Sequence, residues 1–119
     1  MQVIATKITQ NPAIVKFELD EIIVRTENFE FKNIDETQNS PLAKQLFFLP
    51  FVKTVYISGN FIAIEKFSIV EWEDVQEDVA NQINEFISNG GVIIQIDENK
   101  SKKQPVTVYA ETTPNPSVL

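Results

Sequence analysis

The sequence contains no cysteine and no histidine among its 119 residues. Without cysteine the chain forms no disulfide and offers no thiolate to a metal. Without histidine it lacks the commonest metal ligand and the usual general base. Only three glycines are present, and they form no glycine-rich phosphate loop. No nucleophile–base pair is visible, so we expect the chain not to be an enzyme, although carboxylate catalysis stays open.

Basic residues are also scarce. Ten Lys and Arg stand against 17 Asp and Glu, which gives a net charge of −7. An acidic domain repels phosphate backbones, so we expect no nucleic-acid partner.

Apolar runs fall far short of the roughly 20 residues that span a bilayer, so we expect no membrane partner. The first ten residues lack the basic region and long apolar core of a secretory signal, and we therefore expect a cytoplasmic protein.

The apolar content indicates a folded domain. Apolar residues make up 43% of the chain and include nine Phe, which argues against disorder. A length of 119 residues suits one ordinary domain. A domain of this size buries roughly two-thirds of its unfolded surface and needs no covalent staple.

The most apolar stretch of the chain begins with a short predicted helix. Ser40 is a favoured N-cap and Pro41 suits the first helical position. Leu42, Leu46 and Phe47 follow at helical spacing, so the helix buries one side. Pro50 is expected to end it.

A β-hairpin is predicted directly after this helix. Val52–Ile57 and Phe61–Ile64 are rich in β-branched and aromatic residues. Between them, Ser58-Gly59-Asn60 supplies residues that tolerate positive φ. A helix followed by a hairpin is typical of a two-layer α+β domain.

Further elements are predicted on both sides of this stretch. Strands are expected over 2–8, 13–19 and 28–32, a β-prone segment over 22–25, and a last buried strand over 92–96. A second helix begins at Trp72, carries one apolar stripe and ends at Gly90 or Gly91. The predicted fold is therefore α+β: an antiparallel sheet of about five to six strands with two helices packed on one face.

The end of the chain resembles its beginning. The strand-like Val106–Ala110 runs into Thr113-Pro114-Asn115-Pro116, as the first predicted strand runs into Thr9-Gln10-Asn11-Pro12. One interpretation is a domain over 1–97, a charged linker over 98–105 and the start of a truncated second copy over 106–119. Chance similarity of two turn sequences is the alternative.

Several of these pieces together are similar to the Nfu/NifU N-terminal domain family. Thr9-Gln10-Asn11-Pro12 followed by Ile14, Lys16 and Phe17 resembles the family's opening motif. Ser40-Pro41-Leu42-Ala43, then Leu46-Phe47 and the hairpin up to Lys66, resembles its central block. Trp72 falls where the family has a Trp before its long helix. The sequence departs from the pattern at Gln10, Phe51 and Asn60, where the family has Pro, Gly and Asp.

The resemblance implies a role in iron–sulfur cluster assembly. In this family the cluster is carried by a C-terminal domain with a Cys-x-x-Cys motif, which this chain lacks. The resemblance thus implies a non-catalytic accessory module with no cofactor of its own, the cluster belonging only to a downstream domain. The implied partners are iron–sulfur assembly or recipient proteins. Alternatives are a ferrous iron delivery domain and a structural or dimerisation module, the latter self-associating through Val106–Ala110 at a sheet edge.

Acidic residues are the candidates for binding iron. They gather at the start of the second predicted helix: Glu71, Glu73, Asp74, Glu77 and Asp78. Four of these are the metal candidates: Glu73, Asp74, Glu77 and Asp78. The alternative is a solvated helix start whose charge complements the helix dipole. The same two interpretations apply to Glu18, Asp20 and Glu21.

Aromatic residues are the candidates for binding a partner. Residues 47–51 are five consecutive apolar residues, and a helix end points such a run around the full circle. Phe48 or Phe51 is therefore expected at the surface as a partner anchor, unless the sheet and the second helix cover both. Trp72 is either a binding platform or a core residue.

Overall fold

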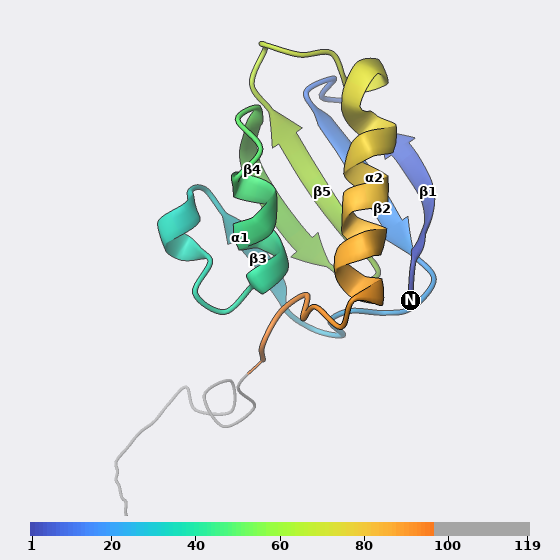
Figure 1. Ribbon diagram of the computed structural model, residues 1–119, viewed down its shortest axis with the longest axis vertical. Coiled ribbons are helices and arrows are strands. Elements are labelled where there is room, and N and C mark those ends of the chain that lie inside the picture. Colours follow the sequence, from blue (N-terminus) through green and yellow to red (C-terminus); the bar gives the residue numbers. More distant parts are fainter. Residues whose placement is uncertain (97–119) are drawn as a thin grey trace, which may run out of the picture.

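The computed structural model describes residues 1–96, which form an antiparallel sheet with two helices on one face (Figure 1). The five strands lie in the order β1-β2-β5-β4-β3, and every neighbouring pair is antiparallel. In chain order the elements are β1 (Val3–Ile8), β2 (Ile14–Leu19), β3 (Asn28–Phe31), the 3-10 turn η1 (Ile34–Glu36), α1 (Pro41–Phe47), β4 (Val52–Ser58), β5 (Phe61–Lys66) and α2 (Trp72–Ser88). The predicted α+β class is confirmed.

The strands bury one side because their side chains alternate. In β2, Val15, Phe17 and Leu19 are at most 2% exposed, while the residues between them are only half-buried. The hairpin of β4 and β5 turns at Gly59, whose φ of 56° lies in the left-handed region that glycine tolerates. The hairpin predicted from Ser58-Gly59-Asn60 is thus confirmed.

Helix α1 begins as its sequence predicts. The hydroxyl oxygen of Ser40 accepts a hydrogen bond from the backbone N–H of Ala43 at 3.1 Å. Pro41 occupies the first turn, where its missing N–H costs nothing. The helix buries Leu42, Ala43 and Leu46 against the sheet and stops before Pro50. Residues 48–51 then connect α1 to β4.

Helix α2 runs across the same face of the sheet and buries Trp72, Val79 and Ile83. Gly90 ends it with a φ of 86°, and the Gly90 N–H donates to the carbonyl of Ile87 at 3.0 Å. No helix within residues 1–96 combines the length and apolarity needed to cross a membrane.

The predicted last strand, Val92–Ile96, is wrong. The segment pairs with no strand but crosses the start of α1, where Gln95 N–H donates to the Asn39 carbonyl at 2.6 Å. Ile93 is buried, whereas Val92 and Ile96 are 45% and 42% exposed. A short apolar run indicates burial without saying whether a sheet edge is available for pairing.

The β-prone segment 22–25 is likewise no strand. The backbone N–H groups of Ile23 and Val24 both donate to the carbonyl of Gly59, at 2.7 and 3.2 Å. The segment therefore wraps around the turn of the β4–β5 hairpin. The predicted linker over 98–105, the predicted second copy over 106–119 and the predicted pairing of Val106–Ala110 lie outside the described residues.

Candidate docking surface

The three aromatic candidates differ in exposure. Phe48 is 64% exposed, whereas Phe51 and Trp72 are 8% and 6% exposed. Phe48 follows the last residue of α1 and points away from the core. The sequence predicted that Phe48 or Phe51 lies at the surface, and it is Phe48 that does so.

Phe51 and Trp72 belong to an aromatic cluster in the core. The Trp72 ring lies edge-on to Phe51 and to Phe17, with ring centroids 6.3 and 5.8 Å apart. Phe51 immediately precedes β4, which directs its ring toward the helix layer, and Trp72 is the first residue of α2. The interpretations of Phe51 as a surface anchor and of Trp72 as an exposed platform do not fit this burial.

Two exposed apolar residues that the sequence analysis did not single out lie in the loop between β5 and α2. Phe67 is 46% exposed and Ile69 is 66% exposed. The backbone N–H of Phe67 donates to the carbonyl of Phe51 at 2.7 Å, which ties this loop to the segment after α1. The sequence did contain a signal, because the apolar residues Phe67, Ile69 and Val70 lie between the end of β5 and the start of α2.

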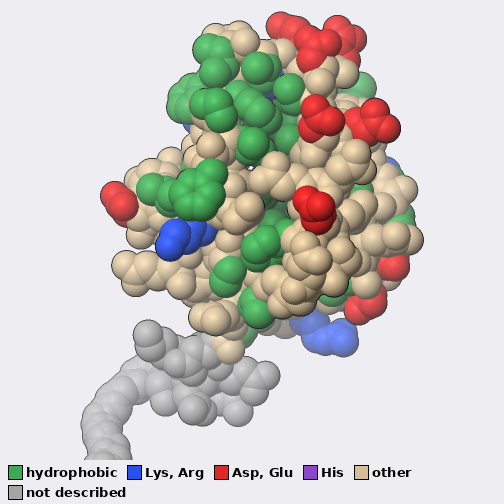
Figure 2. Space-filling model, in the orientation of Figure 1, with side chains coloured by type: hydrophobic (Ala, Val, Ile, Leu, Met, Phe, Trp, Pro, Cys, Tyr) green, Lys and Arg blue, Asp and Glu red, His purple; other side chains and the backbone are tan. Residues whose placement is uncertain are grey.

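Together these residues form an apolar surface at one end of the domain. Figure 2 shows hydrophobic side chains gathered at the end where α1 stops and β5 leads into α2. We call its exposed members, Phe48, Phe67 and Ile69, the apolar end patch. Clustered apolar exposure of this kind marks interaction surfaces more often than single exposed residues do.

The acidic residues at the start of α2 border this patch, and Figure 2 shows them beside the hydrophobic side chains. All five are exposed: Glu71, Glu73, Asp74, Glu77 and Asp78. Within residues 1–96 none of them forms an ion pair, and no three acidic side chains converge in an arrangement that would hold a metal ion. The four metal candidates are thus neighbours along one helix.

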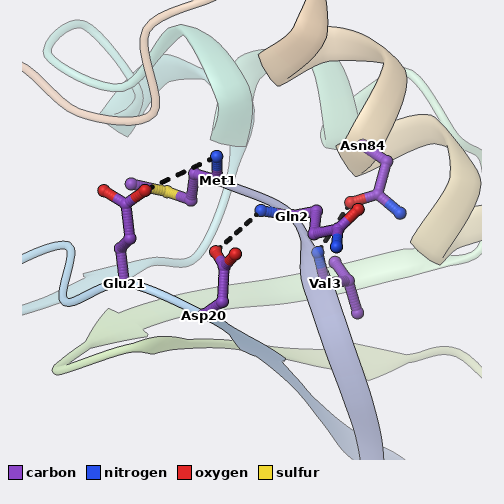
Figure 3. A network of polar contacts seen from close by, with 6 residues as sticks. All are labelled: Met1, Gln2, Val3, Asp20, Glu21 and Asn84. Atoms are coloured by element: carbon purple, nitrogen blue, oxygen red, sulfur yellow. Dashed lines mark hydrogen bonds and ion pairs between the residues drawn. The ribbon is translucent and has the colours of Figure 1, made fainter.

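The second acidic cluster makes contacts that hold β1 and the residues before it (Figure 3). Asp20 accepts from the backbone N–H of Gln2 at 3.0 Å, and the Glu21 carboxylate lies 3.6 Å from the amino group of Met1. Glu18, in β2, pairs with Lys7 of β1 at 3.2 Å. These carboxylates therefore have structural partners.

A surface hollow of about 540 Å³ lies beside η1 and α1. Its lining residues are Ile34, Asp35, Thr37, Gln38, Pro41 and Lys44. Asp35 and Lys44 are its charged members, and within residues 1–96 neither forms an ion pair.

The chain does not have the donor set of a cysteine-bound iron–sulfur cluster. Such clusters are held by cysteine thiolates, occasionally with histidine. None of the 119 residues is a cysteine or a histidine, so this chain binds no cluster in that way.

A family model and individual related proteins both match this chain and point to the same family. Residues 4–90 match the family described as "Scaffold protein Nfu/NifU N terminal". The chain is 30% identical over 99 residues to the mitochondrial NFU1 iron–sulfur cluster scaffold homologue of Drosophila willistoni, covering 82% of this chain and 34% of that protein. It is 31% identical over 88 residues to the Homo sapiens protein of the same name, covering 73% and 35%. The chain thus spans about a third of the length of these relatives.

A solved structure shares the fold. The solution NMR structure of a NifU-like protein from Saccharomyces cerevisiae superposes with a TM-score of 0.68. The match covers 81% of this chain and 87% of that chain at 24% sequence identity. Likeness at this identity establishes the arrangement of strands and helices only.

The expectation of a cytoplasmic protein is contradicted. The matching scaffold homologues of Drosophila willistoni and Homo sapiens are mitochondrial proteins by name. Acidic composition does not distinguish these compartments, because an organelle address is read from its own segment and not from the fold.

Proposed function

The chain belongs to the Nfu/NifU N-terminal domain family, and we propose that it is a non-catalytic interaction module of an iron–sulfur scaffold protein. In this role it docks assembly or recipient proteins while another domain carries the cluster. The absence of cysteine and histidine supports the division of labour. The docking surface we propose is the apolar end patch.

The exposure of Phe48, Phe67 and Ile69 is the observation that carries this proposal. Their exposed fractions are 64%, 46% and 66%, and none of the three belongs to the buried core cluster. Complete burial of one such side chain supplies roughly 1.5–3 kcal/mol, and the exposed part of each forgoes its share of that free energy. A partner that covers the patch recovers part of that free energy, which is how hot-spot aromatics act at interfaces.

The proposal is tested in a cellular replacement experiment. The full 119-residue chain replaces the N-terminal module of the yeast NifU-like protein, and the activity of iron–sulfur enzymes is measured in extracts. The matched variant carries Phe48→Ser, Phe67→Ser and Ile69→Ser. We expect the unchanged chain to support enzyme activity and the triple variant to lose most of that support, at equal protein level.

Two controls make the result specific. Lys44→Ser, Asn81→Ser and Glu85→Ser together alter exposed positions outside the patch and should leave activity unchanged. Deleting the module altogether shows whether the module is needed. Full activity of the triple patch variant would reject the patch as the docking surface, and full activity of the deletion would reject the module's role.

A further inference from the structure

We propose that the partner presents a cationic amphipathic segment to this surface, with apolar side chains on the apolar end patch and Lys or Arg side chains over the start of α2. This inference deepens the proposed function and rests on it. It states what the docked polypeptide must look like chemically.

The two halves of the surface are continuous along the chain. Ile69 belongs to the apolar end patch, and Glu71, Glu73 and Asp74 follow within five residues. Figure 2 shows the hydrophobic and acidic side chains side by side at this end of the domain. An interface that covers Phe67 and Ile69 therefore brings its edge over carboxylates.

Helix capping does not explain this concentration of charge. Glu71 is the N-cap residue, yet its side chain makes no capping hydrogen bond. The helix dipole favours acidic residues in the first turn, which accounts for Glu73 and Asp74, but its effect falls off beyond that turn. Glu77 and Asp78 lie in the second turn and gain little from it.

The same charges are unfavourable to one another in the free domain. Glu73 and Glu77 are spaced i,i+4, and so are Asp74 and Asp78. Like-charge pairs at this spacing destabilise a helix. Within residues 1–96 no Lys or Arg pairs with these carboxylates. A cationic partner relieves the repulsion and gains attraction at the rim of the interface.

The charge also decides between classes of partner. Anionic membranes and nucleic acids are repelled by five exposed carboxylates and by a net charge of −7. A basic polypeptide is attracted, and complementary charge at an interface rim mainly raises the association rate and selects the partner. The apolar contacts supply most of the affinity.

The test uses the isotopically labelled 119-residue chain and two model helical peptides. One peptide has leucine on one face and lysine on the other, and its counterpart has glutamate in place of lysine. Binding is followed residue by residue by NMR. We expect the lysine peptide to shift amide signals of residues 48, 67, 69 and 71–78 and the glutamate peptide to leave them unchanged. Raising the salt concentration should weaken lysine-peptide binding by roughly tenfold, because rim charges are screened.

Two variants separate the contributions. Replacing Glu73 and Glu77 by Gln and Asp74 and Asp78 by Asn keeps side-chain size and should abolish the preference for the lysine peptide. The Phe48→Ser, Phe67→Ser, Ile69→Ser variant should lose binding of that peptide altogether. Equal binding of both peptides at the patch would overturn the cationic partner while leaving the proposed function standing. Lysine-peptide signals elsewhere on the domain, or none, would also overturn it, and the replacement experiment would still decide the function independently.

Discussion

The indole N–H of Trp72 donates a hydrogen bond to the carbonyl oxygen of Ala13 at 2.7 Å. This bond joins the first residue of α2 to the residue before β2. The same carbonyl accepts from the backbone N–H of Lys66 at 3.0 Å, at the end of β5. This one carbonyl oxygen therefore links the start of β2 to the end of β5 and to the start of α2.

Substitutions at Trp72 should therefore act on stability. Trp72→Phe keeps an aromatic ring but loses the hydrogen bond and should lower the free energy of unfolding by about 1–2 kcal/mol. Trp72→Ala also empties the core beside Phe17 and Phe51 and should cost about 3–5 kcal/mol. Trp72 is the chain's one tryptophan, so both variants lose tryptophan fluorescence. Urea unfolding is therefore followed by circular dichroism. A loss below about 1 kcal/mol for Trp72→Ala would contradict its place in the core.

Ser40→Ala should destabilise the domain more than the loss of an ordinary cap. The buried hydroxyl accepts from the Ala43 N–H at 3.1 Å and donates to the Ile93 carbonyl at 2.7 Å. Its removal forfeits the N-cap and leaves a buried carbonyl unpaired, a combined loss of about 2–3 kcal/mol. Urea midpoints measure the loss, and Ser68→Ala, at an exposed loop position, is the control. Equal midpoints for the two variants would show that neither the cap nor the Ile93 contact stabilises the domain.

Asn84→Ala should loosen the start of β1. The Asn84 side-chain oxygen accepts from the backbone N–H of Val3 at 2.7 Å (Figure 3). Asn81→Ala, on the exposed side of the same helix, makes the same change in helix propensity without this contact. Relative to that control, Asn84→Ala should lower the free energy of unfolding by about 1 kcal/mol. Hydrogen exchange at the Val3 amide should accelerate in the Asn84 variant alone.

Phe48 and Phe51 should behave oppositely although they are three residues apart. Phe48→Ala removes a side chain that is 64% exposed and should change the free energy of unfolding by no more than about 0.5 kcal/mol. Phe51→Ala removes one that is 8% exposed and should cost about 3–5 kcal/mol. Urea unfolding of both variants measures the difference. Similar losses would show that the two rings share one environment.

Ferrous iron should not bind tightly at the start of α2. Carboxylates of Glu73, Asp74, Glu77 and Asp78 lie along one exposed helix, and within residues 1–96 no three acidic groups converge on a point. An anaerobic titration of the labelled chain, followed by NMR with magnesium as control, should show no localised iron-specific broadening there. Such broadening at micromolar iron would restore the delivery interpretation. It would also show that the carboxylates rearrange around the ion.

Local sequence patterns predicted most of the helices and strands, because each pattern depends on only a few neighbouring residues. Ser40 and Pro41 specify a helix start wherever they occur in front of an apolar stripe. Gly59 permits the backbone turn between β4 and β5. Gly90 does the same for the end of α2. Alternation in β2 separated its buried face from its open face before any partner strand was known.

The sequence could not predict which side chains after α1 are buried, because their burial depends on how the second helix packs beside them. Phe48 and Phe51 are chemically identical, and only the docking of α2 through Trp72 covers one and leaves the other in water. Residues 92–96 have the composition of a strand but cross α1 instead of meeting a sheet edge.

The sequence by itself determined the α+β class, the hairpin, both helices and the absence of thiolate and imidazole chemistry, since each follows from residue types and short spacings. Only the tertiary structure decided that Phe67 and Ile69 join Phe48 in one exposed patch beside the acidic start of α2. These residues are about 20 positions apart along the chain, and a surface is made by segments that packing brings together.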